Sequence, residues 1–307
     1  MAKNNNLHTA KKAKNDEFYT QLCDIENELK HYRQHFVGKV VYCNCDDARE
    51  SNFFKFFSLN FEFLGLKKLI STGYKENGKG VKLVYEGDKN GNKMPDFDEI
   101  EVTELEGNGD FRSPECIELL KESDIVVTNP PFSLFREYVA QLVEYGKQFL
   151  IIGNKNAITY KEIFSLIKEN KLWLGISSPN EYRLPNGEIT KQVNGLCRWF
   201  TNMEHDKRNM PFDLYMKYSN EYFPKYDNYD AIEVSKTCDI PMDFDGVMGV
   251  PITFLDKYCP EQFEILDARN YTDNVKLQNK STYLIKDKDG AINGKATYAR
   301  ILIRHKR

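Results

Sequence analysis

Short apolar segments alternate with stretches of helical pattern through the first half of the chain. The apolar segments begin the ranges 39–47, 67–74, 124–132 and 147–154, and the helical patterns occupy 50–61, 113–123, 133–146 and 159–171. Strands that alternate with helices in this way predict a parallel sheet with helices packed on both faces. We therefore expect an α/β fold for this part of the chain.

Each of the four predicted strands ends in polar residues. These are Asn44 to Asp47, Ser71 to Tyr74, Asn129 to Phe132, and Gly153 with Asn154. Ligands of open α/β sheets bind at the carboxyl ends of the strands. We expect these four groups of residues to lie close together and to form the functional site.

Local signals add detail between these strands. The sequence "GDKNGNK" lies between two β-rich runs, so residues 80–104 are predicted to form a hairpin. Ser113 is suited to cap a helix, and Pro114 to its first position. Residues 172–177 have the pattern of another strand.

The third strand runs into two consecutive prolines, in "DIVVTNPPF". Proline has no amide hydrogen for a strand ladder, so the strand must end there in a rigid turn. The turn carries the Asn129 carboxamide, the carbonyls of Pro130 and Pro131, and the Phe132 ring. Two oxygen acceptors can bind an exocyclic amine of a nucleobase and free its lone pair for attack on a methyl sulfonium, while the ring stacks on a base taken out of the helix. The alternative is an ordinary turn.

Charge is unevenly distributed along the chain. The formal net charge is −3, but residues 86–124 hold thirteen acidic and four basic residues, which leaves the rest of the chain positive. Residues 1–14, which end at Lys14, carry four lysines and no acid. Such a basic segment is suited to phosphate contacts, so Lys14 is predicted to bind DNA. The alternative is a solvated chain end.

Cysteine spacing and hydropathy exclude several other classes. Seven cysteines are scattered and odd in number, which favours reduced thiols, and neither they nor the five histidines are spaced as metal ligands. No apolar stretch is long enough to span a membrane, and the polar N-terminus does not have the pattern of a secretory signal. We expect a cytoplasmic protein without a metal.

Three spaced motifs together resemble a known enzyme group. "NPPF" at 129–132 resembles the catalytic motif of amino-methyltransferases that use S-adenosylmethionine. "NDEFYTQ" at 15–21 resembles the segment of adenine DNA methyltransferases that closes over the methionine part of the cofactor, and "GNGDF" at 107–111 resembles their adenosine-binding element. Together with "VYCNCDDARESNFFKFF", "LISTGY" and "GVPITFLDKYCPEQFEIL", they make the chain similar to EcoRI-type adenine-specific modification methylases over almost its whole length.

The resemblance implies a fold, a cofactor and a set of site residues. The fold is a Rossmann-like methyltransferase sheet with helices on both faces and a smaller C-terminal target-recognition region. The cofactor is S-adenosylmethionine, and the catalytic residues are Asn129, Pro130, Pro131 and Phe132. Asn129 is also expected to contact the cofactor, together with Phe18, Tyr19, Thr20, Asn44, Cys45, Asp46, Asp47, Ser71, Asp110 and Phe111.

The turn after the first strand departs from the usual methyltransferase pattern. Most methyltransferases have a glycine-rich loop there, whereas this chain reads Asn44-Cys45-Asp46-Asp47-Ala48-Arg49. The resemblance to the EcoRI-type group includes this substitution. The sequence does not decide which of these residues touch the cofactor, and Asp46 and Asp47 could instead cap the following helix.

The pattern changes after residue 205. The sequence becomes rich in Tyr, Asn and Lys and loses its periodicity, so we predict a catalytic domain over 1–205 and a target-recognition region over 206–307. Lys207 and Arg208 are the predicted DNA contacts there. The Trp199-Phe200 pair is expected to be core, with a face of the base pocket as the alternative.

The function that these observations favour is methylation of adenine N6 in duplex DNA at a specific site, with restriction-modification or phage modification as its setting. We expect a monomer whose partners are double-stranded DNA and, in a restriction system, a cognate endonuclease. RNA or a protein glutamine amide are alternative substrates, because the same Asn-Pro-Pro-aromatic chemistry serves them. A non-catalytic nucleic-acid binder is disfavoured by the intact Asn129 and Phe132.

Overall fold

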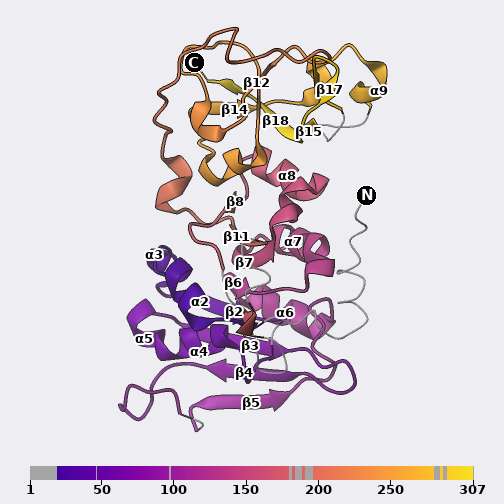
Figure 1. Ribbon diagram of the computed structural model, residues 1–307. Coiled ribbons are helices and arrows are strands. Elements are labelled where there is room, and N and C mark those ends of the chain that lie inside the picture. The colour runs from indigo at the N-terminus through magenta and orange to yellow at the C-terminus, as the bar shows by residue number, and fades with distance from the viewer. Residues whose placement is uncertain are drawn as a thin grey trace. The chain divides into compact units, whose positions relative to one another are not determined.

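The computed structural model describes most of the chain as two compact units. The described residues are 19–45, 47–96, 98–179, 182–183, 189–190, 196–279, 284–285 and 289–306. The first unit comprises Met1–Ile163 and Lys171–His205, and the second comprises Phe164–Asn170 and Asp206–Arg307. Figure 1 labels helices and strands of both units where there is room.

The described part of the first unit is built on an eight-stranded sheet with the order β5-β4-β3-β2-β6-β7-β11-β8. The strands are β2 (Val40–Cys43), β3 (Lys68–Gly73), β4 (Val81–Tyr85), β5 (Ile100–Glu104), β6 (Ile125–Thr128), β7 (Gln148–Asn154), β8 (Trp173–Leu174) and β11 (Cys197–Thr201). Strands β3, β2, β6 and β7 are parallel, and the outer strands are antiparallel to their neighbours. The predicted α/β sheet is confirmed.

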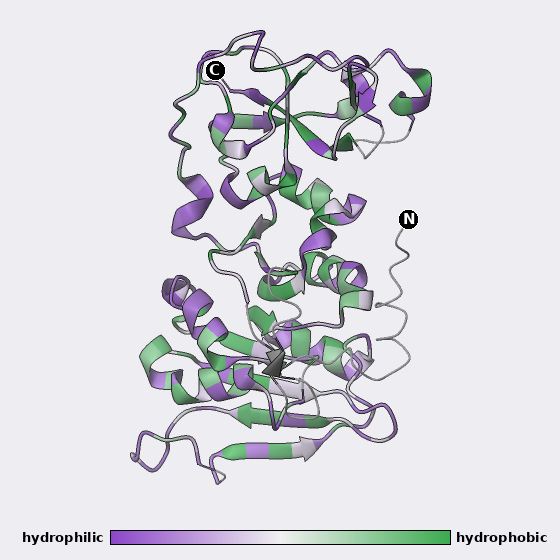
Figure 2. Ribbon diagram, in the orientation of Figure 1, coloured by the Kyte–Doolittle hydropathy of each residue, from purple (hydrophilic) through white to green (hydrophobic). Residues whose placement is uncertain are grey.

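Helices cover both faces of this sheet (Figure 1). Val41 and Cys43 of β2 belong to a buried cluster with Phe53 and Phe57, which lie on α4 (Asn52–Leu59). The helix α2 (Leu22–Leu29) contributes to the same cluster. On the opposite face, Phe135 of α7 (Phe135–Glu144) packs on Phe200 of β11 with ring centroids 5.0 Å apart. Figure 2 shows the central strands as hydrophobic, as expected for strands covered on both sides.

Two local predictions are confirmed in detail. Ser113 caps α6 (Pro114–Glu122): its side chain accepts a hydrogen bond from the Cys116 amide at 3.2 Å. The 80–104 hairpin forms as the antiparallel pair β4–β5. The strand predicted at 172–177 is shorter than expected, because pairing with β11 involves only Trp173 and Leu174.

The remaining elements of this part of the chain are short. They are α3 (Arg33–Phe36), α5 (Phe61–Leu64) and the 3-10 helices η1 (Phe132–Leu134) and η2 (Lys155–Thr159). The helix α8 (Lys161–Lys168) begins in the first unit, and its residues from Phe164 on belong to the second unit. A separate three-stranded sheet pairs β1 (Tyr19–Thr20) with β9 (Tyr182–Arg183), which also pairs with β10 (Ile189–Thr190). The N-terminal motif is therefore held by a segment far away in the sequence.

The second unit contains its own smaller sheet. It comprises β12 (Ile232–Glu233), β13 (Met248–Val250), β18 (Arg300–His305), β14 (Phe263–Ile265) and β15 (Leu284–Ile285), and β16 (Ala291–Ile292) pairs separately with β17 (Lys295–Ala296). The short helices are η3 (Asp206–Asn209), η4 (Thr237–Asp239), η5 (Ile252–Lys257), η6 (Ala268–Tyr271) and α9 (Val275–Gln278).

A buried ion pair fixes the core of the second unit. Arg300 and Glu233 are both almost fully buried, and the Arg300 Nε donates to Glu233 Oε1 at 2.9 Å. The Tyr226 hydroxyl donates to the other carboxylate oxygen. The carboxylate and guanidinium satisfy each other, so their burial is tolerated. Across the described residues of both units, no helix is long and apolar enough to cross a membrane.

Candidate active site

The polar residues predicted to cluster lie at one edge of the first unit's sheet. Strands β2, β6 and β7 are parallel neighbours, so Asn44, Asn129 and Asn154 stand at the same edge. From β2 the chain proceeds to β3 on one side, whereas β6 occupies the other side. This reversal of strand order between β2 and β6 is the point at which α/β sheets bind their ligands.

The Asn-Pro-Pro-Phe segment lies directly after β6. Thr128 is the last strand residue, Asn129 is partly exposed, and Pro130 is buried. The Pro131 carbonyl accepts from the Leu134 amide at 3.0 Å and starts η1. The Pro131 carbonyl is thus already engaged in a hydrogen bond, which leaves the Pro130 carbonyl as the other candidate acceptor for a substrate. Phe132 is partly buried against the core and retains exposed surface.

The turn after β2 is held by side chains and contains no glycine. Asn44 is almost fully buried, and its carboxamide oxygen accepts from the Tyr138 hydroxyl. Its carbonyl oxygen accepts from the Thr128 hydroxyl. Cys45 has a φ of +66°, in the left-handed region that favours glycine. Asp47 is exposed, and its carboxylate accepts from the Arg49 amide at 2.9 Å.

The 107–111 loop packs against the end of β3. A Cβ on Gly109 would lie 2.4 Å from the Gly73 carbonyl oxygen, and φ of Gly109 is +81°, so only glycine fits there. The next residue, Asp110, accepts from Arg112 Nε at 2.9 Å and from Nη2 at 2.7 Å. These hydrogen bonds hold the pKa of Asp110 below its usual value. Phe111 is buried, with its ring 5.0 Å from that of Tyr138 in an edge-to-face arrangement.

The N-terminal motif contacts the start of α4. The Asn52 side-chain Nδ2 donates to the Thr20 carbonyl at 2.7 Å. Thr20 is 1% exposed, and its hydroxyl has no hydrogen-bond partner among the described residues. A buried hydroxyl normally has a partner, so this oxygen is a candidate contact for a polar ligand group. Only the backbone of Tyr19 is described, in β1.

The other residues singled out from the sequence lie in different places. Ser71 lies in the polar end of β3, level with Cys43 at the end of β2, and is buried; its contact with the cofactor stays a prediction. Trp199 is fully buried, with its ring centroid 6.1 Å from that of Phe53, so the expectation that it is a core residue is confirmed. Lys14, Phe18 and Asp46 lie outside the described residues.

Three contributing residues were not predicted from the sequence. Tyr138 joins the Asn44 turn to Phe111, Arg112 orients Asp110, and Asn52 binds the Thr20 backbone. The role of Arg112 could have been predicted from the sequence, because an Arg two residues after an Asp in a turn can fold back and donate to that Asp. Tyr138 and Asn52 have the pattern of ordinary helix residues.

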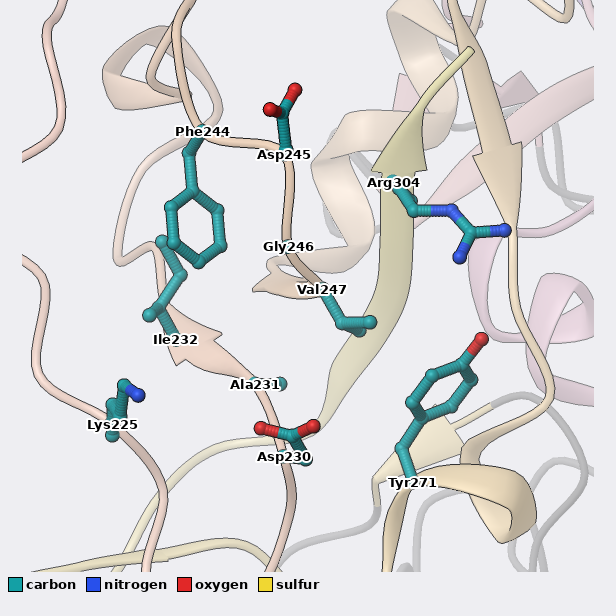
Figure 3. A pocket seen from close by; sticks show the side chains of 10 residues that line it. All are labelled: Lys225, Asp230, Ala231, Ile232, Phe244, Asp245, Gly246, Val247, Tyr271 and Arg304. Atoms are coloured by element: carbon teal, nitrogen blue, oxygen red, sulfur yellow. The ribbon is translucent and has the colours of Figure 1, made fainter. Parts of the chain in front are cut away.

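A hollow of about 250 Å³ lies in the second unit. Figure 3 shows Arg304 and Tyr271 on one side of it, with Phe244 and Lys225 on the other side and Asp230 between them. Arg304 is held by Glu264 at 2.9 Å, and the Asp230 amide donates to the Tyr271 carbonyl at 2.9 Å. Lys207 and Arg208, the predicted DNA contacts, lie in η3 of the same unit.

An α/β sheet with parallel central strands and Asn-Pro-Pro-Phe at its switch point has the features expected of an amino-methyltransferase. Residues 6–306 match the family described as "Adenine-specific methyltransferase EcoRI". The chain belongs to this family and is a site-specific adenine methyltransferase of the restriction-modification type.

Named relatives cover essentially the whole chain. It is 53% identical to the type II methyltransferase M.EcoRI of Escherichia coli, over 100% of this chain and 98% of the relative. It is 40% identical to M.MgeORF184P of Mycoplasma genitalium, over 97% and 98%, and 40% identical to M.MpnI of Mycoplasma pneumoniae, over 98% of each. No solved structure matches the chain.

Proposed function

We propose that this enzyme transfers a methyl group from S-adenosylmethionine to N6 of an adenine flipped out of duplex DNA. The observation that supports this most is the position of Asn129 to Phe132, directly after β6, beside the Asn44 turn at the sheet's switch point. A reactive base bound there is next to the residues suited to the cofactor.

Asn129 and Pro130 bind the amino group that reacts. The Asn129 carboxamide oxygen and the Pro130 carbonyl accept its two hydrogens, so the nitrogen lone pair is withdrawn from the aromatic ring and becomes nucleophilic. The same oxygens stabilise the positive charge that develops on the nitrogen. The nitrogen then loses a proton to water. Phe132 stacks on the flipped base and holds it in place.

The residues around the turn fit S-adenosylmethionine. S-adenosylmethionine supplies an electrophilic methyl group when it is bound. The Thr20 hydroxyl, buried and unpaired in the described structure, is suited to its polar methionine end. The Asp110 carboxylate accepts three hydrogen bonds from Arg112. A carboxylate has about four lone-pair sites, so one remains to accept from an adenosine N–H or O–H. We include Tyr19, Cys45, Asp47 and Phe111 in the same pocket.

The second unit is the proposed site of DNA recognition. The catalytic loop selects one base, so neighbouring bases must be read by other side chains. Lys207 and Arg208 are suited to phosphate contacts. In the hollow, the Asp230 carboxylate can accept from an exocyclic amine, and Arg304 and Tyr271 can donate to a base edge. We further propose that the enzyme acts as a cytoplasmic monomer.

Transfer of tritiated methyl groups tests this function. The enzyme is incubated with labelled S-adenosylmethionine and, separately, with duplex DNA, RNA and a glutamine-containing protein. The proposal predicts label in DNA, recovered as N6-methyladenine within one sequence context. Label only in RNA or protein would contradict it. Survival of the modified DNA against extracts of the source cells tests for a cognate endonuclease.

A further inference from the structure

The turn after β2 is fixed without the glycines that methyltransferases usually place there. Its residue Cys45 takes a left-handed backbone conformation, with a φ of +66°. Such a conformation is unfavourable for a residue with a side chain and persists only where the surroundings impose it. The conformation of Cys45 therefore requires an explanation, and the contacts of the preceding residue, Asn44, provide it.

Two donors from different elements converge on Asn44. Thr128, the last residue of β6, donates its hydroxyl to the Asn44 carbonyl, and Tyr138 of α7 donates its hydroxyl to the Asn44 carboxamide oxygen. All three residues are at most 3% exposed. In this dry environment each lost donor leaves an acceptor unsatisfied, so the geometry is strongly enforced. We name these three residues the Asn44 clamp.

The clamp also reaches the other two parts of the site. Thr128 precedes Asn129 directly, so the turn is tied to the base of the catalytic loop. The Tyr138 ring packs edge-on against Phe111 at 5.0 Å, which ties the turn to the loop that carries Asp110. Burial raises the pKa of the Tyr138 hydroxyl well above its ordinary value, so it remains a donor at every working pH.

We propose that Tyr138 and Thr128 are positioning residues that hold the glycine-free turn in the shape that binds S-adenosylmethionine. The clamp replaces the glycine-rich loop of other methyltransferases. The hydroxyls of Thr128 and Tyr138 fix the turn by hydrogen bonds to Asn44. The inference rests on the proposed function, because it assigns the cofactor to this turn.

The test measures S-adenosylmethionine binding to the full chain by calorimetry. Tyr138→Phe removes the donor and keeps the ring against Phe111, and Thr128→Val removes the other donor and keeps the branched shape. Each variant is expected to raise the dissociation constant by roughly twofold to tenfold, as expected for one hydrogen bond. The two changes should combine non-additively, because both act on Asn44.

Tyr32→Phe is the matched control. Tyr32 is equally buried and donates to Glu28 Oε1 at 2.8 Å, and its ring packs on His35 and His205, which belong neither to the Asn44 turn nor to the 107–111 loop. Tyr32→Phe should lower the midpoint of thermal unfolding, as Tyr138→Phe should, and leave the dissociation constant for S-adenosylmethionine unchanged. This separates positioning from general stability.

Unchanged cofactor affinity in both Tyr138→Phe and Thr128→Val, in protein that methylates DNA, would overturn the clamp and leave the proposed function intact. An equal loss of affinity in Tyr32→Phe would also overturn it. If Tyr138→Phe does not fold, Thr128→Val alone decides. Wild-type protein that neither binds S-adenosylmethionine nor methylates DNA would instead show that the proposed function is wrong.

Discussion

The Arg112 guanidinium donates two hydrogen bonds to the Asp110 carboxylate, from Nε at 2.9 Å and from Nη2 at 2.7 Å. The Arg112 amide adds a third, also at 2.9 Å. The carboxylate is therefore oriented before any ligand arrives, which lowers the cost of binding one. The preceding residue, Gly109, also has a fixed position, because a Cβ there would collide with the Gly73 carbonyl. The loop proposed to bind adenosine is therefore held in one shape.

Asp110→Ala is expected to raise the dissociation constant for S-adenosylmethionine by roughly twofold to tenfold, because one oriented acceptor is lost. Arg112 lowers the Asp110 pKa, so the carboxylate remains charged from pH 8 down past its ordinary value of about 3.9. Wild-type affinity should consequently show no Asp110 titration between about pH 5 and pH 8. Calorimetry across this range measures both effects, and unchanged affinity in the variant would move the adenosine site elsewhere.

Gly109→Ala tests the close approach of the loop to β3. A Cβ would lie 2.4 Å from the Gly73 oxygen, and the positive φ adds strain, so we expect a loss of about 1–3 kcal/mol in the free energy of unfolding together with weaker cofactor binding. Gly107→Ala is the matched control, because nothing lies within 4 Å of its added Cβ. Urea unfolding of the two variants compares them, and equal stabilities would contradict the packing described.

Phe132→Ala should weaken methylation of DNA by roughly 1–3 kcal/mol in kcat/KM, the usual contribution of an aromatic–base stack. Phe132→Tyr and Phe132→Trp retain a flat ring and should keep most activity. Steady-state rates on one duplex substrate measure the series. If all three variants are impaired alike, Phe132 serves packing against the core and not stacking.

The sequence was sufficient to predict the order of strands and helices in the first unit and the motif at the end of β6. These features depend on local periodicity and turn chemistry, which one sequence displays. The strand expected within 67–74 forms as β3, with its small polar residues at its end. Its antiparallel pairing with β4, which places Gly73 opposite Val81, is not visible from β3 itself.

The contacts that complete the site are tertiary. Asn44 and Tyr138 are 94 residues apart, and β1 pairs with β9 across more than 160 residues. No local pattern distinguishes a tyrosine that holds a distant turn from one that only fills the core. The short strands of the second unit also lack periodicity, since most are two or three residues long.

Replacing Lys207 and Arg208 by glutamine should weaken DNA binding and leave S-adenosylmethionine binding intact. Loss of one phosphate contact lowers, by about one, the steepness with which the logarithm of the DNA-binding constant falls with the logarithm of the salt concentration. We call this steepness the salt slope. Glu99 would be a poor control, because it is buried and accepts from the amides of Lys89 and Asn90. Glu101 and Glu104 lie exposed on the edge strand β5, so their double replacement is the matched charge change.

Titration at two salt concentrations separates the outcomes for this pair. An unchanged slope, affinity and sequence preference in the Lys207/Arg208 variant would remove η3 from the DNA interface. Asp230→Asn in the hollow should behave differently, because a contact to a base edge affects sequence choice more than the salt slope. If Asp230→Asn discriminates among related DNA sequences as the wild type does, the hollow does not read DNA.

The central claim is that Asn129 activates the amine of a flipped adenine. The most direct test is the single-turnover rate of methyl transfer by Asn129→Ala, with duplex DNA and S-adenosylmethionine both saturating. Removing one of two acceptors from the developing positive charge is expected to slow the rate on the order of 10²-fold or more, by analogy with single deletions in oxyanion holes. Cofactor affinity should be largely retained. A near-normal rate would contradict the assignment of Asn129, and with it the proposed chemistry of this site.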